Sequence, residues 1–144
     1  MANWYEVTTQ HDEMTDTGRE RVVSEKYAIE AYTVTEAEMR ATEELGGACA
    51  GFEVVGAVQR NIRSIVDGGK EDGVWYKVSV RMTSVDDRGK ETRKTVLLLV
   101  WADSVSEATE LAEDDMRSSV ADWDITMVSE TALCDVIKME RDEK

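Results

Sequence analysis

Apolar and polar residues alternate along two segments of the chain, residues 3–11 and residues 74–85. A period of two is typical of a strand with one buried face. Each segment is followed by a turn rich in Asp, Thr and Gly, and then by a second predicted strand near 20–32 or 92–102. The pattern therefore predicts two β-hairpins, one in each half of the chain.

A helix is predicted after each hairpin. Thr33 and Glu36 have the spacing of a capping box, in which a hydroxyl and a carboxylate satisfy the first free amides of a helix. Ser104 and Glu107 have the same spacing in the second half. Apolar residues then recur with helical periodicity, so each helix should bury one face.

The end of each half is also predicted to be similar. A third strand is expected near 52–60 in the first half and near 123–131 in the second. A short turn or helix should follow it and end in Ile65 or Val136.

The two halves are predicted to be copies of one ββαβ unit. Without a gap, Trp75 and Tyr76 fall on Trp4 and Tyr5, and the same shift aligns the helices and the third strands. One copy makes only a marginal core, so two copies related by a pseudo-twofold axis should share a joint core. We expect an α+β fold with the helices on one face of a mostly antiparallel sheet. The expected boundaries are one compact domain over 1–144, repeats at 3–66 and 74–137, and a charged tail at 138–144.

The net charge narrows the range of partners. The chain has 31 acidic and 17 basic residues, a formal net charge of −14. Nucleic-acid and anionic-membrane surfaces are bound through clustered Lys and Arg, so neither is an expected partner. No signal peptide and no run of about 18 apolar residues is recognisable. The expected location is the cytoplasm, or the host cytoplasm if a phage encodes the chain.

The sequence contains few of the residue patterns that are typical of catalytic or metal sites. Cys49 and Cys134 lie far apart without metal-ligand spacing, and we expect them to be reduced and partly buried. His11 is the only histidine and lies near a polar turn. No HExxH, P-loop, GxGxxG or calcium-loop motif is present. The sequence therefore predicts no enzyme, no cofactor and no metal site.

The second predicted strands of the two halves differ on their outer faces. Leu97, Leu99 and Trp101 make the later strand apolar on both faces, and Trp4 and Trp75 fall on the same outer side. An apolar sheet face is not expected to remain in solvent. Three explanations remain open: a homo-oligomer interface, a cover within the chain, or a pocket for a flat ligand between the tryptophans.

Acidic residues concentrate on the second predicted helix. Eight acids lie between Asp103 and Asp124, with Arg117 as the only base. Acids near a helix C-terminus oppose the helix dipole. The cluster is either a solvated face or a negative surface for a basic protein partner, including a mimic of DNA. The candidate partner-binding residues are Glu107, Glu110, Glu113, Asp114 and Asp115.

Arg60 and Arg63 are the only bases between Arg40 and Lys70. They could bind a phosphate, but pairing with acids of the other copy is the favoured interpretation. With Trp4, Trp75, Leu97, Leu99 and Trp101 they form the candidate ligand-binding or oligomer-interface set.

Four motifs resemble a small uncharacterised domain family from bacterial and phage genomes. They are Trp4-Tyr5, the helix start Thr35-Glu36-Ala37-Glu38, the mid-chain Trp75-Tyr76-Lys77, and Val128-Ser129-Glu130-Thr131 with Asp135-Val136. The likeness covers nearly the whole chain and transfers no activity. It implies a phage or mobile-element setting, and hence an accessory or counter-defence factor.

Charge, missing motifs and this resemblance together predict a non-enzymatic acidic protein that occupies a basic protein surface and self-associates. The alternative is a protein that binds or sequesters a small nucleotide-like ligand at protomer interfaces. In that case Trp4, Trp75, Trp101, Arg60 and Arg63 would recognise the ligand.

Overall fold

A computed structural model describes residues 2–48 and 50–139, except for the side chain of Ala48. This part of the chain divides into two compact units, and each is described separately. Unit one contains the residues up to Arg60 together with those from Ala132 onward. Unit two is Asn61–Thr131. Cys49 and most of the predicted tail, residues 140–144, lie outside the described residues.

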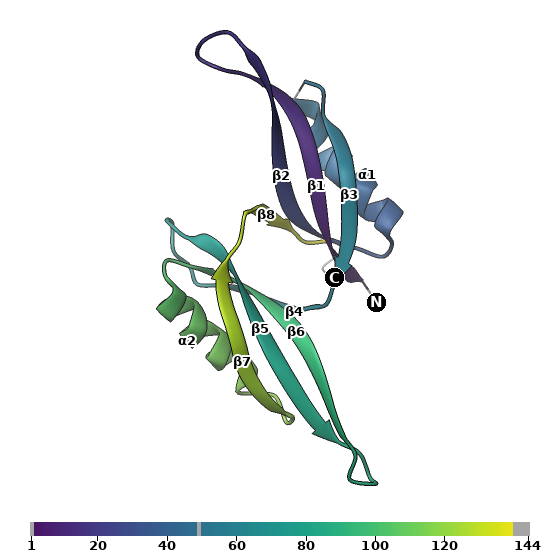
Figure 1. Cartoon of the computed structure of the whole chain (residues 1–144), viewed down its shortest axis with the longest axis vertical. Coiled ribbons are helices and arrows are strands. Elements are labelled where there is room, and N and C mark those ends of the chain that lie inside the picture. The colour runs from purple at the N-terminus through teal and green to yellow at the C-terminus, as the bar shows by residue number, and fades with distance from the viewer. Residues whose placement is uncertain (1, 49, 140–144) are drawn as a thin grey trace, which may run out of the picture. The chain divides into compact units, whose positions relative to one another are not determined.

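Unit one is a four-stranded sheet with one α-helix (Figure 1). Its sheet order is β3-β1-β2-β8, with β2 and β8 parallel and the other neighbours antiparallel. The elements are β1 (Asn3–Met14), β2 (Glu20–Ala31), α1 (Val34–Leu45), the 3-10 helix η1 (Gly46–Ala48), β3 (Glu53–Arg60) and β8 (Leu133–Ile137).

Unit two repeats this arrangement. Its sheet order is β4-β6-β5-β7, and again only the pair that includes the short strand, β4 and β6, is parallel. The elements are β4 (Ile62–Asp67), β5 (Val74–Val85), β6 (Glu91–Ala102), α2 (Val105–Met116) and β7 (Asp122–Glu130). The α+β class and the duplication predicted from the sequence are therefore confirmed.

The short final segment of each copy is a strand, not the predicted turn or short helix. Ile62 pairs with Leu97, and the register then shifts before Ser64. Leu133 pairs with Lys26 and the register shifts at the equivalent place. The repeating unit is therefore ββαββ, and the matching bulges show the duplication at the level of individual hydrogen-bonded pairs.

These short strands are exchanged between the copies. β4 belongs to the first copy in sequence but completes the sheet of unit two. β8 belongs to the second copy but completes the sheet of unit one. The boundaries of the compact units therefore differ from the boundaries of the repeats.

The exchange follows from the length of the connections. In unit one the fourth strand lies three strand spacings from β3, which is about 14 Å across the sheet. β3 ends at Arg60 and β4 begins at Ile62, so two Cα–Cα steps of about 3.8 Å separate them. Three such steps, about 11 Å, separate the end of β7 from the start of β8. Neither short strand can reach the far edge of its own sheet.

Polar contacts add to the backbone pairing of the exchanged strands. In unit two, Ser64 Oγ of β4 donates to Asp115 Oδ2 of α2 at 2.7 Å. In unit one, Arg40 Nη2 of α1 donates to the carbonyl of Lys138, just after β8, at 3.1 Å. Each exchanged strand is thus bonded both to the sheet and to the helix of the unit that it enters.

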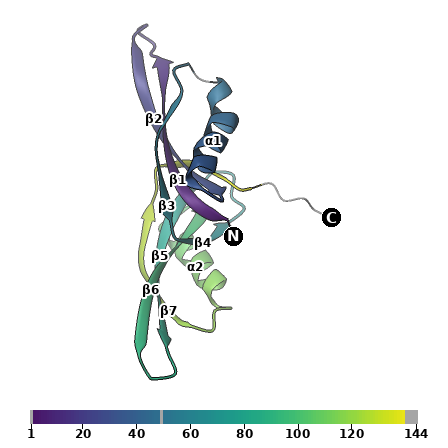
Figure 2. The same cartoon turned by 90° about the vertical axis from the view of Figure 1, so that its right-hand side faces the viewer.

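Each unit has its own hydrophobic core, in place of the joint core expected from the sequence. The helix of each unit packs on one face of its sheet, as Figure 2 shows for α1. Ile29 and Val7 are fully buried in unit one, and Leu98, Val100 and Met116 in unit two. The alternation of the strands and the helical stripe therefore identify the buried faces correctly.

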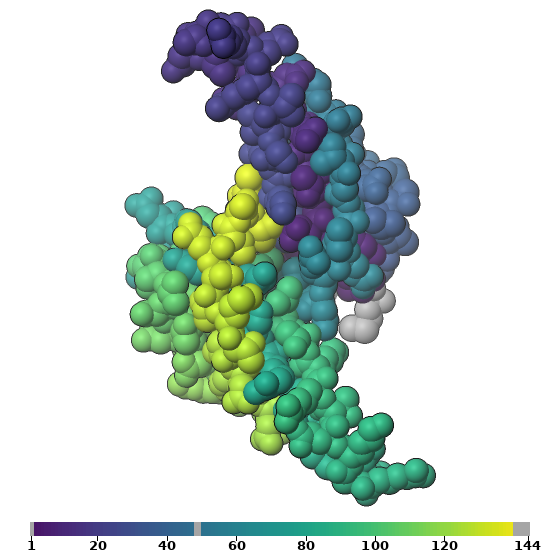
Figure 3. Space-filling view, viewed as in Figure 1, coloured from purple at the N-terminus to yellow at the C-terminus, as the bar shows by residue number. Residues whose placement is uncertain are grey.

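The helix caps and the hairpin turns form as the sequence predicts. Thr33 Oγ1 accepts from the amide of Glu36 at 3.1 Å, and Ser104 Oγ accepts from Glu107 at 3.1 Å. The hairpin turns use Gly18 and Gly89, whose φ values of 80° and 81° favour glycine. The turn of the β1–β2 hairpin and that of the β5–β6 hairpin each project at the surface in Figure 3.

From the strand exchange we predict the oligomeric state of an isolated copy. Residues 1–71 should form a dimer by exchanging β4, because the two steps between Arg60 and Ile62 are too short for β4 to pair with its own β2. Sedimentation equilibrium should show a dimer, and hydrogen exchange should show protected β4 amides. Six Gly and Ser residues inserted after Asn61 serve as the control and should permit a monomer. A monomer with protected β4 amides and no insertion would contradict the explanation.

Candidate functional site

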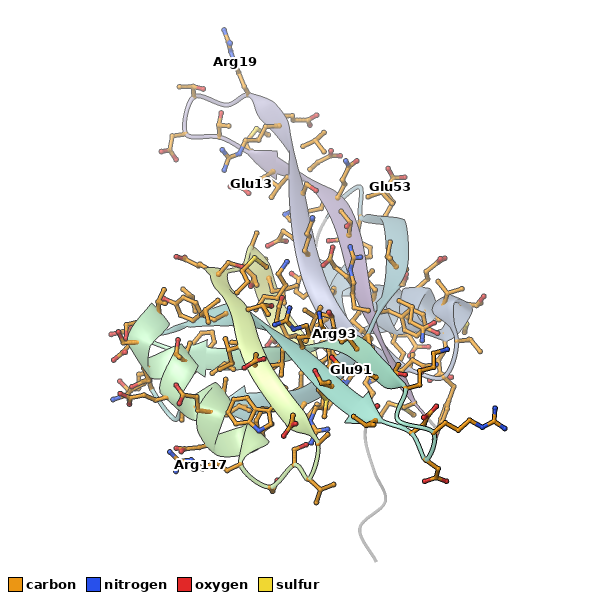
Figure 4. All side chains as sticks on the ribbon, turned by 60° about the horizontal axis from the view of Figure 1, so that its bottom comes forward. Glu13, Arg19, Glu53, Glu91, Arg93 and Arg117 are labelled. Atoms are coloured by element: carbon orange, nitrogen blue, oxygen red, sulfur yellow. The ribbon has the colours of Figure 1, made fainter. Side chains whose placement is uncertain are left out.

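The exposed face of α2 carries the predicted acidic surface. Glu110 and Glu113 are exposed, and neither forms an ion pair or side-chain hydrogen bond with any residue that the structure describes. Asp114 pairs with Arg117 through Oδ1 and Nη1 at 2.9 Å. Figure 4 shows Arg117 at the C-terminal end of this helix. Of the five predicted partner-binding acids, the free ones are therefore Glu110 and Glu113, one helical turn apart.

Two of the five predicted partner-binding acids have structural contacts instead. Glu107 Oε1 accepts from the Asp103 amide at 3.2 Å and completes the capping box, and its Oε2 lies 3.5 Å from Lys70 Nζ. Asp115 accepts the hydrogen bond of Ser64 on β4. These two carboxylates stabilise unit two, so replacing them would disturb the fold as well as any binding surface.

The outer face of β6 is partly buried within the chain. Leu99 is 3% exposed, and Leu97 and Trp101 are half-buried. Trp75 and Trp101 are cross-strand partners whose rings meet edge to face, with centroids 5.3 Å apart. Trp101 Nε1 donates to the Lys70 carbonyl at 2.7 Å, which fixes the indole in place. Burial of Leu99 in a single chain favours a cover within the chain for this part of the face.

The structure divides the predicted ligand residues between the two units. Trp4 lies in unit one, on β1 opposite Glu30 and Arg60. Arg60 Nη2 lies 3.5 Å from Glu6 Oε1, so it pairs with an acid of its own copy and not of the other copy as predicted. Arg63 lies in unit two, where the register of β4 shifts.

A cluster in unit one was missed by the sequence analysis. Glu25 on β2 joins His11 on β1 to Cys134 on β8. Its Oε1 lies 3.4 Å from His11 Nδ1, and its Oε2 accepts from Cys134 Sγ at 3.3 Å. Tyr27 is the next residue on the same face of β2. Burial, and then the charge of Glu25, raise the pKa of Tyr27 to about 12.

The groups around Cys134 do not activate its thiol. Loss of solvent around the sulfur, followed by the hydrogen bond and the charge of Glu25, raises the pKa of Cys134. A reactive cysteine instead needs a positive neighbour that lowers its pKa. Cys134 is exposed, whereas the sequence predicted partial burial. The cluster thus keeps Cys134 as a neutral thiol.

Only the strand pairing reveals this cluster. His11 and Cys134 are far apart in sequence, and the segment around Cys134 was predicted as a turn or helix. The parallel pairing of β8 with β2 places Cys134 beside Glu25. Across residues 2–48 and 50–139, no three His, Cys, Asp or Glu side chains are arranged to hold a metal ion.

Unit two has a shallow, open acidic depression of about 400 Å³ beside the residue 67–73 connection. Val74 and Tyr76 contribute to its wall. Its carboxylates are those of Glu71, Asp72, Asp103 and Glu130. Its lining gives unit two a second acidic surface, besides the exposed face of α2.

Comparison with known proteins bears out the resemblance seen in the sequence. The model of the DUF4494 family, described as a domain of unknown function, matches residues 3–139. The chain belongs to this family. The match spans both copies and both exchanged strands, so the DUF4494 domain is the duplicated structure as a whole. No curated protein matches the chain. Among the described residues, no helix is long and apolar enough to cross a membrane.

The cluster at Glu25 predicts a change in thiol reactivity. Glu25→Gln should lower the pKa of Cys134, because it removes a negative charge beside the sulfur. The alkylation rate of Cys134 at pH 8, followed by peptide mass spectrometry, should rise several-fold as the thiolate fraction increases. Glu13→Gln changes the same charge away from Cys134 and should leave the rate unaltered. Equal rates in both variants would show that Glu25 does not control the thiol.

Substitutions of Leu99 test whether its side chain is buried within one chain or between two subunits. Leu99→Glu should lower the free energy of unfolding by about 3 kcal/mol or more, because it buries an unpaired carboxylate. Leu99→Met keeps the volume and should cost less than about 1.5 kcal/mol. Urea denaturation with size-exclusion chromatography measures both. A stable monomer from Leu99→Glu, with an oligomer in the parent chain, would show a subunit interface instead.

Proposed function

We propose that this DUF4494 chain is a non-enzymatic binding protein that occupies a basic surface on a protein partner. The observation that carries the proposal is the position of Glu110 and Glu113. They are exposed and unpaired on the solvent side of α2, and the last turn of that helix contains no basic residue. A negative surface that is open to solvent is complementary to clustered Lys and Arg.

The positions of Glu110 and Glu113 destabilise α2, and solubility alone would not require acids at these positions. Glu113, in the last turn of α2, opposes the helix dipole, which costs about 0.3–1 kcal/mol. Glu110 and Glu113 are also like charges at i and i+3, which is unfavourable by a few tenths of a kcal/mol. Acids elsewhere on the surface would promote solubility without this cost. Binding to a cationic partner would offset it.

The proposed mode of action is electrostatic. A basic partner would be steered toward α2 by the net charge of −14, and would then pair with Glu110 and Glu113. Such a partner could be a nucleic-acid-binding enzyme, for which the helix presents charge in place of phosphate. We propose that the protein acts in the cytoplasm, or in the host cytoplasm if it is a phage or mobile-element accessory factor. We also propose that the chain self-associates.

The alternative of a small nucleotide-like ligand is less well supported in its original form. Trp75 and Trp101 pack against each other and Trp101 is bonded to Lys70. Arg60 is paired with Glu6. Of the predicted ligand residues, Trp4 and Arg63 have no such contact within the described chain.

Charge reversal on α2 tests the proposal. Glu110→Lys with Glu113→Lys should abolish salt-sensitive capture of a protein partner from a host lysate. The same change should raise the free energy of unfolding by about 0.3–1 kcal/mol, because Lys is favourable near a helix C-terminus. Affinity capture at 0.1 M and 1 M salt, followed by thermal denaturation, measures both effects.

The control is Asp16→Lys with Glu20→Lys, which changes the net charge equally near the exposed β1–β2 turn. This control variant should retain the partner. Equal capture by both variants, or no salt-sensitive partner of the parent chain, would contradict the proposal. The variants leave Glu107 and Asp115 in place, so loss of capture would not reflect loss of their structural bonds.

A further inference from the structure

Unit two also contains a cavity, of about 350 Å³, whose lining is basic. Arg63 of β4 and Lys94 of β6 are its charged residues. The wall includes Met82 and Val96, which share a cross-strand face with Lys94, and Ala121 from the segment after α2. The cavity thus combines two cations with an apolar wall.

The cations are brought together by the exchanged strand. Arg63 falls where the register of β4 shifts between Ile62 and Ser64. Lys94 lies directly opposite Met82 in the β5–β6 ladder. Asn61 bonds to the Thr95 carbonyl through Nδ2 at 3.2 Å and so ties the start of β4 to β6. Arg63 therefore reaches this cavity only because β4 pairs with β6.

Neither cation is neutralised by the protein. No acid among residues 2–48 and 50–139 lies within ion-pair distance of Arg63 or Lys94, and neither side chain forms a hydrogen bond there. Other bases of the described chain, such as Lys77 and Arg88, also lack an acid partner, but Arg63 and Lys94 differ from these two in lining one cavity together. The bases that do pair with an acid are Arg21, Lys26, Arg60, Lys70, Arg81, Arg93 and Arg117.

The fold itself does not require these cations. The duplication supplies the comparison, because Arg63 and Lys94 of unit two correspond to Cys134 and Val23 of unit one. The same backbone arrangement forms there around uncharged side chains. The cations are thus specific to one unit, and a bound anion would be attracted to both of them.

We propose that this cavity binds the phosphate group of a small organic phosphate monoester. A phosphate monoester carries close to two negative charges and three acceptor oxygens, which match a guanidinium and an ammonium. The bonds would run from Arg63 and Lys94 to the phosphate oxygens. The site is independent of the acidic face of α2, so either proposal can fail without the other.

The size and lining favour an organic ester over the free ion. The volume lies at the lower end of the range of ligand pockets, about 300–1,000 Å³. It equals the liquid volume of roughly a dozen waters, at about 30 Å³ each, and exceeds what one phosphate group fills. Met82, Val96 and Ala121 offer apolar contact to the remainder of the ligand.

The test uses the full chain with phenyl phosphate, inorganic phosphate and phenol as probes. NMR titration of backbone amides should show saturable shifts with phenyl phosphate around Arg63, Lys94 and Val96. Inorganic phosphate should bind more weakly at the same residues, and phenol should not bind. No saturable shift with phenyl phosphate, or equal binding of phenol, would overturn the proposal.

Two double variants make the test specific. Arg63→Gln with Lys94→Val should weaken phenyl phosphate binding at least tenfold, since each charged hydrogen bond lost is worth about tenfold or more. Valine is the residue of unit one at the position of Lys94, so the fold should persist, and circular dichroism checks this.

The matched control is Arg88→Gln with Lys90→Gln, near the exposed β5–β6 turn, which removes the same two charges. This variant should bind phenyl phosphate as the parent chain does. Equal weakening in both double variants would show a general charge effect and would contradict a site at Arg63 and Lys94.

Discussion

The parallel pairing of a short strand from one copy with a long strand of the other is the interaction on which this structure depends. β4 with β6 and β8 with β2 each complete a four-stranded sheet. The pairing is imposed by connections of one residue after β3 and two residues after β7, which cannot span a sheet. Neither unit is complete without residues of the other copy, so the two copies must fold together.

The exchanged strands also supply the residues that distinguish the two units. β8 places Cys134 against Glu25 in unit one, and β4 places Arg63 beside Lys94 in unit two. The two positions are equivalent under the duplication, yet one bears a protonated thiol with a carboxylate and the other a pair of free cations. A duplicated scaffold thus carries different chemistry at the same point of the fold, while the core positions remain apolar in both units.

Charge has two roles in this protein. Seven bases of the described chain pair with acids at the surface, where such pairs contribute little to stability. Glu110 and Glu113 on α2, and Arg63 with Lys94 in unit two, have no partner of opposite charge among the described residues. Glu110 and Glu113 bear an electrostatic cost in the isolated chain that a cationic ligand would relieve, and Arg63 and Lys94 are available to an anion. The net charge as a whole therefore says less about function than these two local groups of charges, one on a single helix face and one lining a single cavity.

The sequence by itself determined the hairpins, the capped helices, the buried faces and the duplication, because each depends on local periodicity and short-range hydrogen bonding. The helices are capped by Thr33 and Ser104, and the hairpin turns contain Gly18 and Gly89, as the local sequence predicts. Tertiary structure decided the rest. Leu133–Ile137 is too short to be recognised as a strand alone, and its partner is chosen by connection length and available sheet edge. The contacts of Glu25 with Cys134, of Ser64 with Asp115, and of Arg63 with the cavity wall all follow from that choice.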